Sequence, residues 1–320
     1  MAEKLDATCT NTSNILSVSI NQAHNSASSS AIVNAVTTTL EVGSSVDIDI
    51  GYTSSGNLAH IFTGYVKQIE HIVPENIYTI TCNDVLIKAV DYFIASDTPD
   101  SKYSRQNVSA EDLVEDMLNL ASITNYTHGT TYFTFGITRP VEVNLVSSYD
   151  FCKTVADILA WHVWADNNGL VHFEERRPYV MDSDTPQKTI TTSLMTRVTH
   201  RKSDRDLRNR IVVYGAEGVN AEAEAESPYL PTGFRKSVVV ASPWIDDQDM
   251  AQNAADWNLD KLNRLTEEVS LEIIGDPTIH ARHVLTVTDT YTSTTGDWYV
   301  YTCEHKWGDG GFTTSMELRK

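Results

Sequence analysis

The sequence predicts an α+β protein that is mainly β, in which two antiparallel β domains flank a mixed α+β module. Its 320 residues are enough for two or more domains. Alternating and β-branched runs fill the first and last parts of the chain, whereas helical spacing of apolar residues is concentrated between them. We place the domains at residues 1–95, 96–204 and 205–320, with a loop and a helix inserted into the last at about 216–266.

The first domain is predicted from a series of strand patterns. These are β-branched or alternating runs bounded by turn residues, and they lie at 15–20, 31–40, 46–50, 60–69 and 77–82. No helical spacing interrupts them. Consecutive strands of this kind predict an antiparallel sheet or a small barrel.

The middle module is predicted from a change of period. Apolar residues recur with helical spacing over 109–121, and Ser109 begins a pattern that resembles a capping box with Asp112 in the usual Glu place. A second helix is expected to begin near Ser148 or Asp150. The turn residues at 166–169 then predict a hairpin.

The last domain repeats the order of the first. After a strand at 207–214, an acidic loop at 218–231 and a helix from about 246, strands are predicted at 268–274, 284–288, 298–303 and 312–318. From Val46 to Ile80 is 34 residues, and from Val284 to Met316 is 32. A duplicated domain explains this spacing, although two unrelated antiparallel sheets would produce the same pattern.

Composition excludes several classes of protein. The formal net charge of −19 argues against tight binding to phosphate backbones, which requires Lys and Arg. No apolar run reaches the length of a membrane span, and the first ten residues lack the apolar region of a secretory signal. The four cysteines are far apart and form no CxxC pair, which predicts buried thiols and neither a zinc site nor any other metal centre.

One stretch of the chain carries no charge. From Ala7 to Leu40 there is no Asp, Glu, Lys or Arg, although hydroxyl and amide side chains are abundant. A plain surface hairpin is one interpretation, and the wall of a channel that must stay polar but uncharged is the other. In the second case the candidate lumen-facing residues are Ser26, Ser28, Ser29, Ser30, Thr37 and Thr39.

A short basic stretch is the counterpart of that neutral one. Between residues 197 and 210 arginines and a lysine cluster in an otherwise acidic chain. Nucleic-acid binding is one hypothesis. A belt of salt bridges between subunits fits the acidic background better, and its candidate members are Arg201, Arg205, Arg208 and Arg210.

The sequence offers no constellation that predicts catalysis. Asp47 and Asp49 share a strand face, but alternating strand carboxylates are usually solvated. No G-x-S-x-G elbow is present, and the glycines at 308–311 lack the spacing of a phosphate-binding loop. We therefore predict no catalytic residues and no cofactor.

Several segments, taken in order, resemble a known family. They are FTGYV (62–66), TCND (81–84), SAEDLVEDMLNLASITNY (109–126), DFCKTVADILAWHVWADNNGLVHF (150–173), LRNRIVVYG (207–215), LNRLTEEVSLEIIGDP (262–277) and WYVYTCEHKW (298–307). The ordered set resembles the tail hub or baseplate hub proteins of tailed phages, the late control protein D family. The base of the type VI secretion spike protein is related to this family.

The resemblance implies a fold and a function. It implies two tube-protein-like antiparallel β-barrel domains in each chain and a homotrimer whose six barrels continue a sixfold tail tube. Its expected partners are a tail tube or distal tail ring protein and a central spike or tail tip protein, with tape-measure and baseplate wedge proteins as further neighbours. Genomic DNA would pass through without specific binding, and the chain itself would not enter a membrane.

The same resemblance predicts the location, the tail tip or baseplate of a virion assembled in the host cytoplasm. Two other functions remain open at this point. A cell-wall glycan hydrolase would need paired carboxylates in a cleft. A receptor-binding tail module would need an exposed aromatic platform, and Trp161, Trp164, Trp257, Trp298 and Trp307 are its candidates, although their apolar surroundings favour a role in the core.

Overall fold

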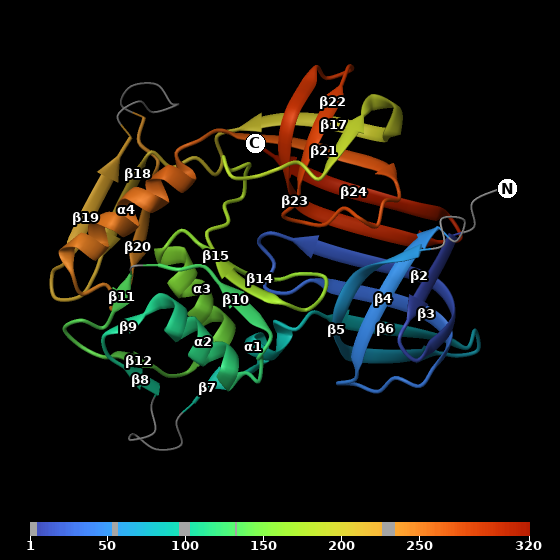
Figure 1. Cartoon of the computed structure of the whole chain (residues 1–320), viewed down its shortest axis with the longest axis horizontal. Helices are drawn as coiled ribbons and strands as arrows, with labels where there is room; N and C mark the ends of the chain where they lie inside the picture. Colours follow the sequence, from blue (N-terminus) through green and yellow to red (C-terminus); the bar gives the residue numbers. More distant parts are fainter. Residues whose placement is uncertain (1–4, 53–56, 96–102, 132, 226–233) are drawn as a thin grey trace.

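Half of the described strands belong to one large sheet, and the helices lie beside it (Figure 1). The computed structural model describes residues 5–52, 57–95, 103–131, 133–225 and 234–320. Over these residues the protein is mainly β, with four α-helices and a sheet of twelve strands that is antiparallel except for one pair. The prediction of a mainly β, α+β protein is confirmed at this level.

The first six strands form a closed circuit. They are β1 (Leu5–Cys9), β2 (Thr12–Ala23), β3 (Ser30–Thr38), β4 (Ser45–Tyr52), β5 (Asn57–Ile72) and β6 (Ile77–Asn83). They pair in the order β1-β4-β5-β6-β3-β2, and β2 meets β1 again where Thr12 pairs with Cys9. Alternate side chains such as Ile20, Ile48 and Ile80 are fully buried inside the circuit, as the period of two predicts.

Six strands from the second half of the chain form a similar unit. They are β16 (Lys188–Thr191), β17 (Met195–Ser203), β21 (Thr266–Ile274), β22 (Val284–Asp289), β23 (Thr294–Gly308) and β24 (Gly311–Arg319). They pair in the order β16-β22-β23-β24-β21-β17, with β16 parallel to β22. A single 3₁₀ turn, η3 (Thr192–Leu194), joins β16 to β17 and so brings the circuit back on itself.

The two units share their strand order and one local irregularity. β3-β6-β5-β4 in the first corresponds to β21-β24-β23-β22 in the second. Val66 pairs with Cys82 immediately before a β-bulge in β5, and Val300 pairs with Leu318 immediately before a β-bulge in β23. Around these bulges the sequences YVKQIEH (65–71) and YVYTCEH (299–305) share four residues. The bulge therefore gives a residue-by-residue equivalence between β5 and β23.

Backbone pairing joins the two units into one sheet. Six residues of β2, Val18 to Ala23, pair antiparallel with Trp307 to Thr302 of β23. The long strand β23 is shared: its first part pairs with β22 and its last part with β2, while β24 runs along its other side.

The middle of the chain folds into a helical layer with short strands. Its helices are α1 (Ile87–Asp91), α2 (Ala110–Leu120) and α3 (Ser148–Ile158). The Ser109 hydroxyl accepts a hydrogen bond from the Asp112 amide (3.1 Å) at the start of α2, which confirms the predicted cap, and Ser147 and Asp150 do the same for α3 (3.0 Å).

Short strands surround these helices. The predicted hairpin is β14 (His162–Ala165) and β15 (Val171–Glu174), and β10 (Tyr126–His128) adds to it in parallel. The remaining pairs are β7 (Phe93–Ile94) with β13 (Val146–Ser147), β8 (Tyr103–Arg105) with β12 (Val141–Val143), and β9 (Val108–Ser109) with β11 (Thr134–Phe135).

Strand pairing crosses the domain boundaries that the sequence suggested. β16 and β17, which precede residue 204, belong to the large sheet, while β18 (Arg210–Tyr214), β19 (Asn220–Glu224), β20 (Ser237–Ala241) and α4 (Gln248–Leu262) pack on the core of α2 and α3. β17 was not predicted as a strand, because most of its side chains are exposed and its sequence lacks apolar alternation. In the predicted acidic loop, 220–224 is a strand, and 226–231 lies outside the described residues.

Candidate functional site

A concave polar surface crosses the junction of the two units. It is the open face of β2, β23, β24, β21 and β17, and it encloses a groove of about 550 Å³. The apolar alternate residues of these strands are buried on the opposite face, so the groove is lined by the polar ones. These polar lining residues are Asn21, Arg197, Thr199, Ser270, Glu272, Thr302, Glu304, Ser315 and Glu317.

In the first unit the same face carries a neutral row of side chains. Ser17, Asn34 and Thr79 are neighbours across β2, β3 and β6. The Asn34 amide donates to the Ser17 hydroxyl (2.9 Å), and the Thr79 hydroxyl donates to the Asn34 carbonyl (2.7 Å). These bonds satisfy the amide within the row, and Glu70 of β5 ends the row beside Thr79.

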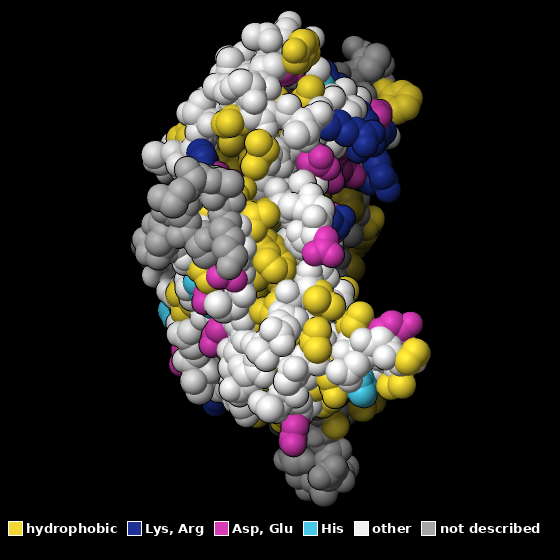
Figure 2. All heavy atoms as spheres, turned by 90° about the vertical axis from the view of Figure 1, so that its right-hand side faces the viewer, with side chains coloured by type: hydrophobic (Ala, Val, Ile, Leu, Met, Phe, Trp, Pro, Cys, Tyr) yellow, Lys and Arg dark blue, Asp and Glu magenta, His cyan; other side chains and the backbone are white. Residues whose placement is uncertain are grey.

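In the second unit the equivalent row is charged. Arg197 is the neighbour of Glu272 across β17 and β21, Glu272 is the neighbour of Ser315, and Glu304 ends the row. Figure 2 looks onto the side of the molecule where the large sheet lies in Figure 1, and its clearest group of Lys and Arg side chains lies beside Asp and Glu in the upper half. The two units therefore present equivalent strand faces with different charge.

The six predicted lumen residues do not lie on one face. Ser30 follows the open-face alternation of β3, whereas Ser29 is buried and its amide donates to the Asp84 carboxylate (2.5 Å). Burial raises the pKa of Asp84, and the bonds from Ser29 oppose that shift. Ser26 and Ser28 lie in the β2–β3 connection, and Thr37 and Thr39 lie at the opposite end of β3.

The four predicted belt arginines do not lie together on one strand: Arg201 and Arg210 lie on strands of two different sheets, and Arg205 and Arg208 lie in the connection between them. Arg201 on β17 donates to Glu268 of β21 (2.8 Å), and Arg210 on β18 donates to Glu222 of β19 (2.6 Å). Arg208 donates to backbone carbonyls. Arg205 is exposed and has no ion-pair partner within the described part of the chain. Arg201 is the member that lies at the edge of the large sheet.

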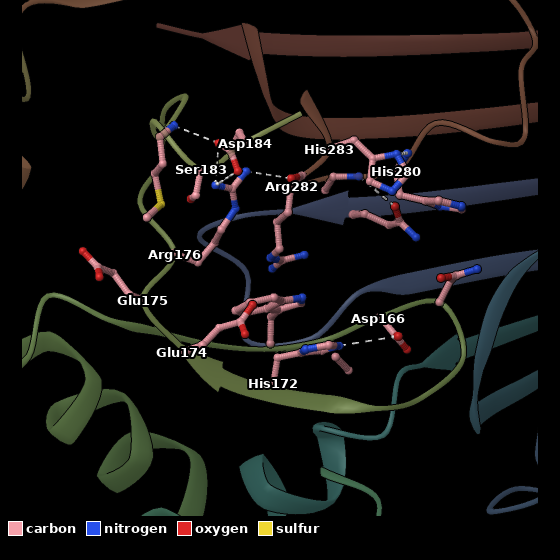
Figure 3. A pocket seen from close by; sticks show the side chains of 16 residues that line it. Asp166, His172, Glu174, Glu175, Arg176, Ser183, Asp184, His280, Arg282 and His283 are labelled. Atoms are coloured by element: carbon pink, nitrogen blue, oxygen red, sulfur yellow. Dashed lines mark hydrogen bonds and ion pairs between the residues drawn. The ribbon is translucent and has the colours of Figure 1, made fainter. Parts of the chain in front are cut away.

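A polar pocket of about 520 Å³ lies where the second unit meets the β14–β15 hairpin (Figure 3). Arg176 binds both oxygens of Asp184 (3.0 and 2.9 Å) and donates to the Arg282 carbonyl (2.8 Å). Figure 3 shows the Arg282 side chain extending from the 280–283 turn toward the hairpin. Its guanidinium donates to the Ala23 carbonyl (3.0 Å) at the end of β2.

Arg282 connects three parts of the chain. Besides Ala23, its guanidinium lies 5.4 Å from the Trp164 ring of β14, and its backbone precedes β22. Burial lowers the pKa of Arg282, and its Nε has no hydrogen-bond partner within the described residues. Because the guanidinium contacts both the end of β2 and the β14–β15 hairpin, we interpret this pocket as a structural junction.

Buried histidines accompany this junction, and the sequence analysis did not single them out. The His24 ring stacks on His162 (4.1 Å between centroids), and its Nδ1 lies 2.6 Å from the Tyr299 hydroxyl. Burial lowers the pKa of both imidazoles well below the ordinary value. Isolated histidines give no signal in sequence, since only the fold brings them together.

The carboxylates considered for hydrolysis have structural neighbours. Asp47 accepts from the Thr63 hydroxyl (2.8 Å), and Asp49 lies 2.8 Å from His60 Nδ1. Among the described residues no three His, Cys, Asp or Glu side chains converge as a metal site would require. No helix in the described ranges is long and apolar enough to cross a membrane.

The fold is similar to that of solved phage tail proteins. The structure is similar to a tail protein of Neisseria meningitidis MC58 (TM-score 0.72, 11% identity, 100% of this chain and 97% of that one). It is also similar to the 43 kDa tail protein of prophage MuSo2 from Shewanella oneidensis (TM-score 0.70, 13% identity, 99% and 98%).

A third similar structure extends the comparison to secretion systems. The c3393 protein of E. coli is described as a component of the type VI secretion system similar to the T4 tail proteins gp27 and gp5 (TM-score 0.58, 8% identity, 98% and 76%). The sequence profile of the YQBQ-like family matches residues 16–319, so the chain belongs to that family. Comparison with curated proteins finds no match. The predicted resemblance to phage tail hub proteins is confirmed.

Proposed function

We propose that the chain is the structural tail hub of a tailed phage. In this proposal each six-strand unit is a tube-like barrel, and three chains assemble into a pseudo-sixfold ring. The ring joins the tail tube to the central spike or tail tip and forms part of the DNA conduit. Its similarity to structural tail proteins supports a role without turnover of a substrate.

The observation that carries the proposal is the repeated strand order within one chain. Two units with the order β3-β6-β5-β4 and β21-β24-β23-β22 are already joined edge to edge through β2 and β23. A head-to-tail contact that repeats this internal one generates a closed ring when its rotation fits. Three chains would then supply six similar units to a sixfold partner.

The polar concave face fits the lining of such a conduit. A wall along which DNA slides should offer few fixed cations, because each Lys or Arg can hold a phosphate. The Ser17, Asn34 and Thr79 row carries none, and in the second row Arg197 is a neighbour of Glu272. Ser26, Ser28, Ser29, Ser30, Thr37 and Thr39 remain the proposed lumen residues of the hairpin, and Ser30 has the strongest structural support.

The partners follow from the same proposal. One rim of the ring would meet a tail tube or distal tail ring protein and the other a central spike or tail tip protein, with tape-measure and baseplate wedge proteins nearby. DNA would pass without specific binding. The site of action would be the tail tip or baseplate of the virion, after assembly in the host cytoplasm.

Mass photometry of the purified chain tests the proposal. A hub predicts particles of three times 35.6 kDa. A persistent monomer that lyses cell walls would replace it with the glycan hydrolase, and a monomer that binds host cells would replace it with the receptor-binding module. Either result would refute the hub.

A further inference from the structure

The large sheet has open strand edges in the described chain, and the long ones belong to β17 and β5. β17 ends the strand order, so one side of Val198 to Ser203 has no backbone partner. β5 pairs with β4 only as far as Tyr65, and Gly43 and Ser44 pair with Val66. Beyond this point one side of β5 is open, although β6 continues along the other side to Ile72. Open edges of this length favour pairing with another chain.

The internal junction between β2 and β23 shows how two such edges can pair. The open part of β5 is equivalent to the part of β23 that pairs with β2, and the open edge of β17 is equivalent to the edge of β2 that pairs with β23. In the internal junction these two kinds of edge meet each other. The corresponding contact between chains would pair β17 of one chain with β5 of the next.

The register of this contact between chains follows from the residue pairs within each unit. In the first, Val66 pairs with Cys82, Cys82 with Ala31, and Ala31 with Ile20. In the second, Val300 pairs with Leu318, Leu318 with Val269, and Val269 with His200. Ile20 and His200 are therefore equivalent positions on β2 and β17.

The internal junction then fixes the partner of His200. Ile20 pairs with His305, which lies five residues after Val300, and five residues after Val66 is His71. The equivalent contact between chains places His200 opposite His71 of the next chain. One step along the antiparallel pair places Arg201 opposite Glu70.

We propose that β17 of one chain pairs antiparallel with the open end of β5 of the next chain, with Arg201 opposite Glu70. This inference rests on the proposed trimeric hub and names the surface that closes it. The occupant of each edge is a second copy of this chain, and the contact is head-to-tail.

The side chains of the two edges suit each other. Arg201 already donates to Glu268 of its own chain, but its side chain is 65% exposed, so that Glu70 of the next chain can approach it from the other side, and opposite charges directly across an antiparallel pair attract. In the same register, Val198 faces Val73 and Thr199 faces Ile72. Ile72 ends β5 and Val73 follows it, and they are 40% and 73% exposed in the single chain. The contact would cover them.

Mixed cysteine crosslinking tests the register. One chain carries Arg201→Cys and the other Glu70→Cys, and the mixture is oxidised mildly and separated without reductant. We expect covalent dimers from the mixture and none from either variant alone, because a head-to-tail contact never brings two copies of one position together. The four native cysteines are buried and do not compete.

Two matched variants serve as controls. Asn21→Cys with Glu304→Cys in one chain marks the equivalent internal pair and should crosslink within the chain. Lys202→Cys mixed with Glu70→Cys should not crosslink, since a slip of one residue places the side chains on opposite faces. Dimers from a single variant, or from Lys202→Cys but not Arg201→Cys, would overturn the register.

Charge reversal provides a second readout. Glu70→Arg should weaken assembly about two- to five-fold per contact, and Glu70→Gln should weaken it less, since both variants leave the Arg201–Glu268 ion pair within the chain intact. If trimers form normally but neither crosslinking nor reversal responds, this pairing is wrong and the hub proposal stands. If the chain stays monomeric at every concentration and no crosslink forms, both are wrong.

Discussion

The two six-strand units keep the same strand order with different edges and different surfaces. In the first unit the outer edge of β2 is covered by β23, and its residue Ile20 is fully buried. In the second unit the equivalent edge of β17 is open, and His200 is half-buried. The residue at this equivalent position is therefore apolar where the edge is covered within the chain and polar where the edge is open.

The comparison also distinguishes residues that determine the fold from residues that determine the charge of the surface. The β-bulge and the YV and EH pairs around it are kept in β5 and β23, because they set the bend and register of the longest strands. The open faces differ freely: Asn34 is replaced by Glu272, and Ser17 by Arg197. Two units can thus share a shape while alternating in charge.

The largest expected effect comes from truncating the covered edge. Ile20→Ala should lower the free energy of unfolding by about 2–5 kcal/mol, because it opens a cavity in a closed core. His200→Ala at the equivalent open edge should cost about 1 kcal/mol or less in the monomer. Urea unfolding of both variants at low protein concentration measures the difference. Equal losses would contradict the distinction between the two edges.

Acid should destabilise the second unit through its buried imidazole. Burial lowers the pKa of His305 to about 4, while the equivalent His71 is exposed. Between pH 6.5 and 4 the unfolded chain binds a proton that the folded chain excludes, so stability falls as the pH falls, by up to about 3 kcal/mol. His305→Gln should reduce the pH dependence of urea unfolding without abolishing it, because burial also lowers the pKa of four other histidines, His24, His162, His280 and His283.

A positive charge placed in the neutral row should make the conduit retain DNA. Asn34→Arg should raise the affinity of assembled rings for duplex DNA on the order of ten-fold at low salt, with a steep loss as salt rises. Fluorescence anisotropy at two salt concentrations measures this, with Asn34→Gln as the uncharged control. Equally tight binding by the unmodified rings would contradict a non-retaining wall.

The smallest effect is expected from neutralising the charged row. Glu272→Gln should change the free energy of unfolding by less than about 1 kcal/mol, because glutamine keeps an acceptor for the Thr196 hydroxyl (2.9 Å) and a surface charge contributes little. Ring formation should also persist. A large loss of stability in urea unfolding would indicate that the charges of the second unit hold its fold together.

The sequence predicted the elements better than their pairing. Regular signals such as the alternation at 46–50 and the Ser109 cap led to the strand β4 and the helix α2 as the structure has them. β17 gave no such signal, because an edge strand with an open face lacks apolar alternation. Its place in the large sheet depends on contacts with β21, which local sequence does not encode.

The candidate site was only partly accessible for the same reason. The absence of charge between Ala7 and Leu40 predicted a polar, uncharged surface, but the neutral row on the open face of β2 and β3 is formed by Ser17 and Asn34, which were not among the six candidates. The facing residues Thr79 and Glu272 come from distant strands, so only the register brings them into rows. The junction around Arg282 likewise depends on segments far apart in sequence.

A cryo-electron-microscopy reconstruction of the assembled protein, calculated without imposed symmetry, tests the central claim most directly. The account predicts three chains in a ring with an open axis, in which first and second units alternate and their polar rows face the hole. A twofold dimer, or a ring whose polar rows face outward, would contradict it.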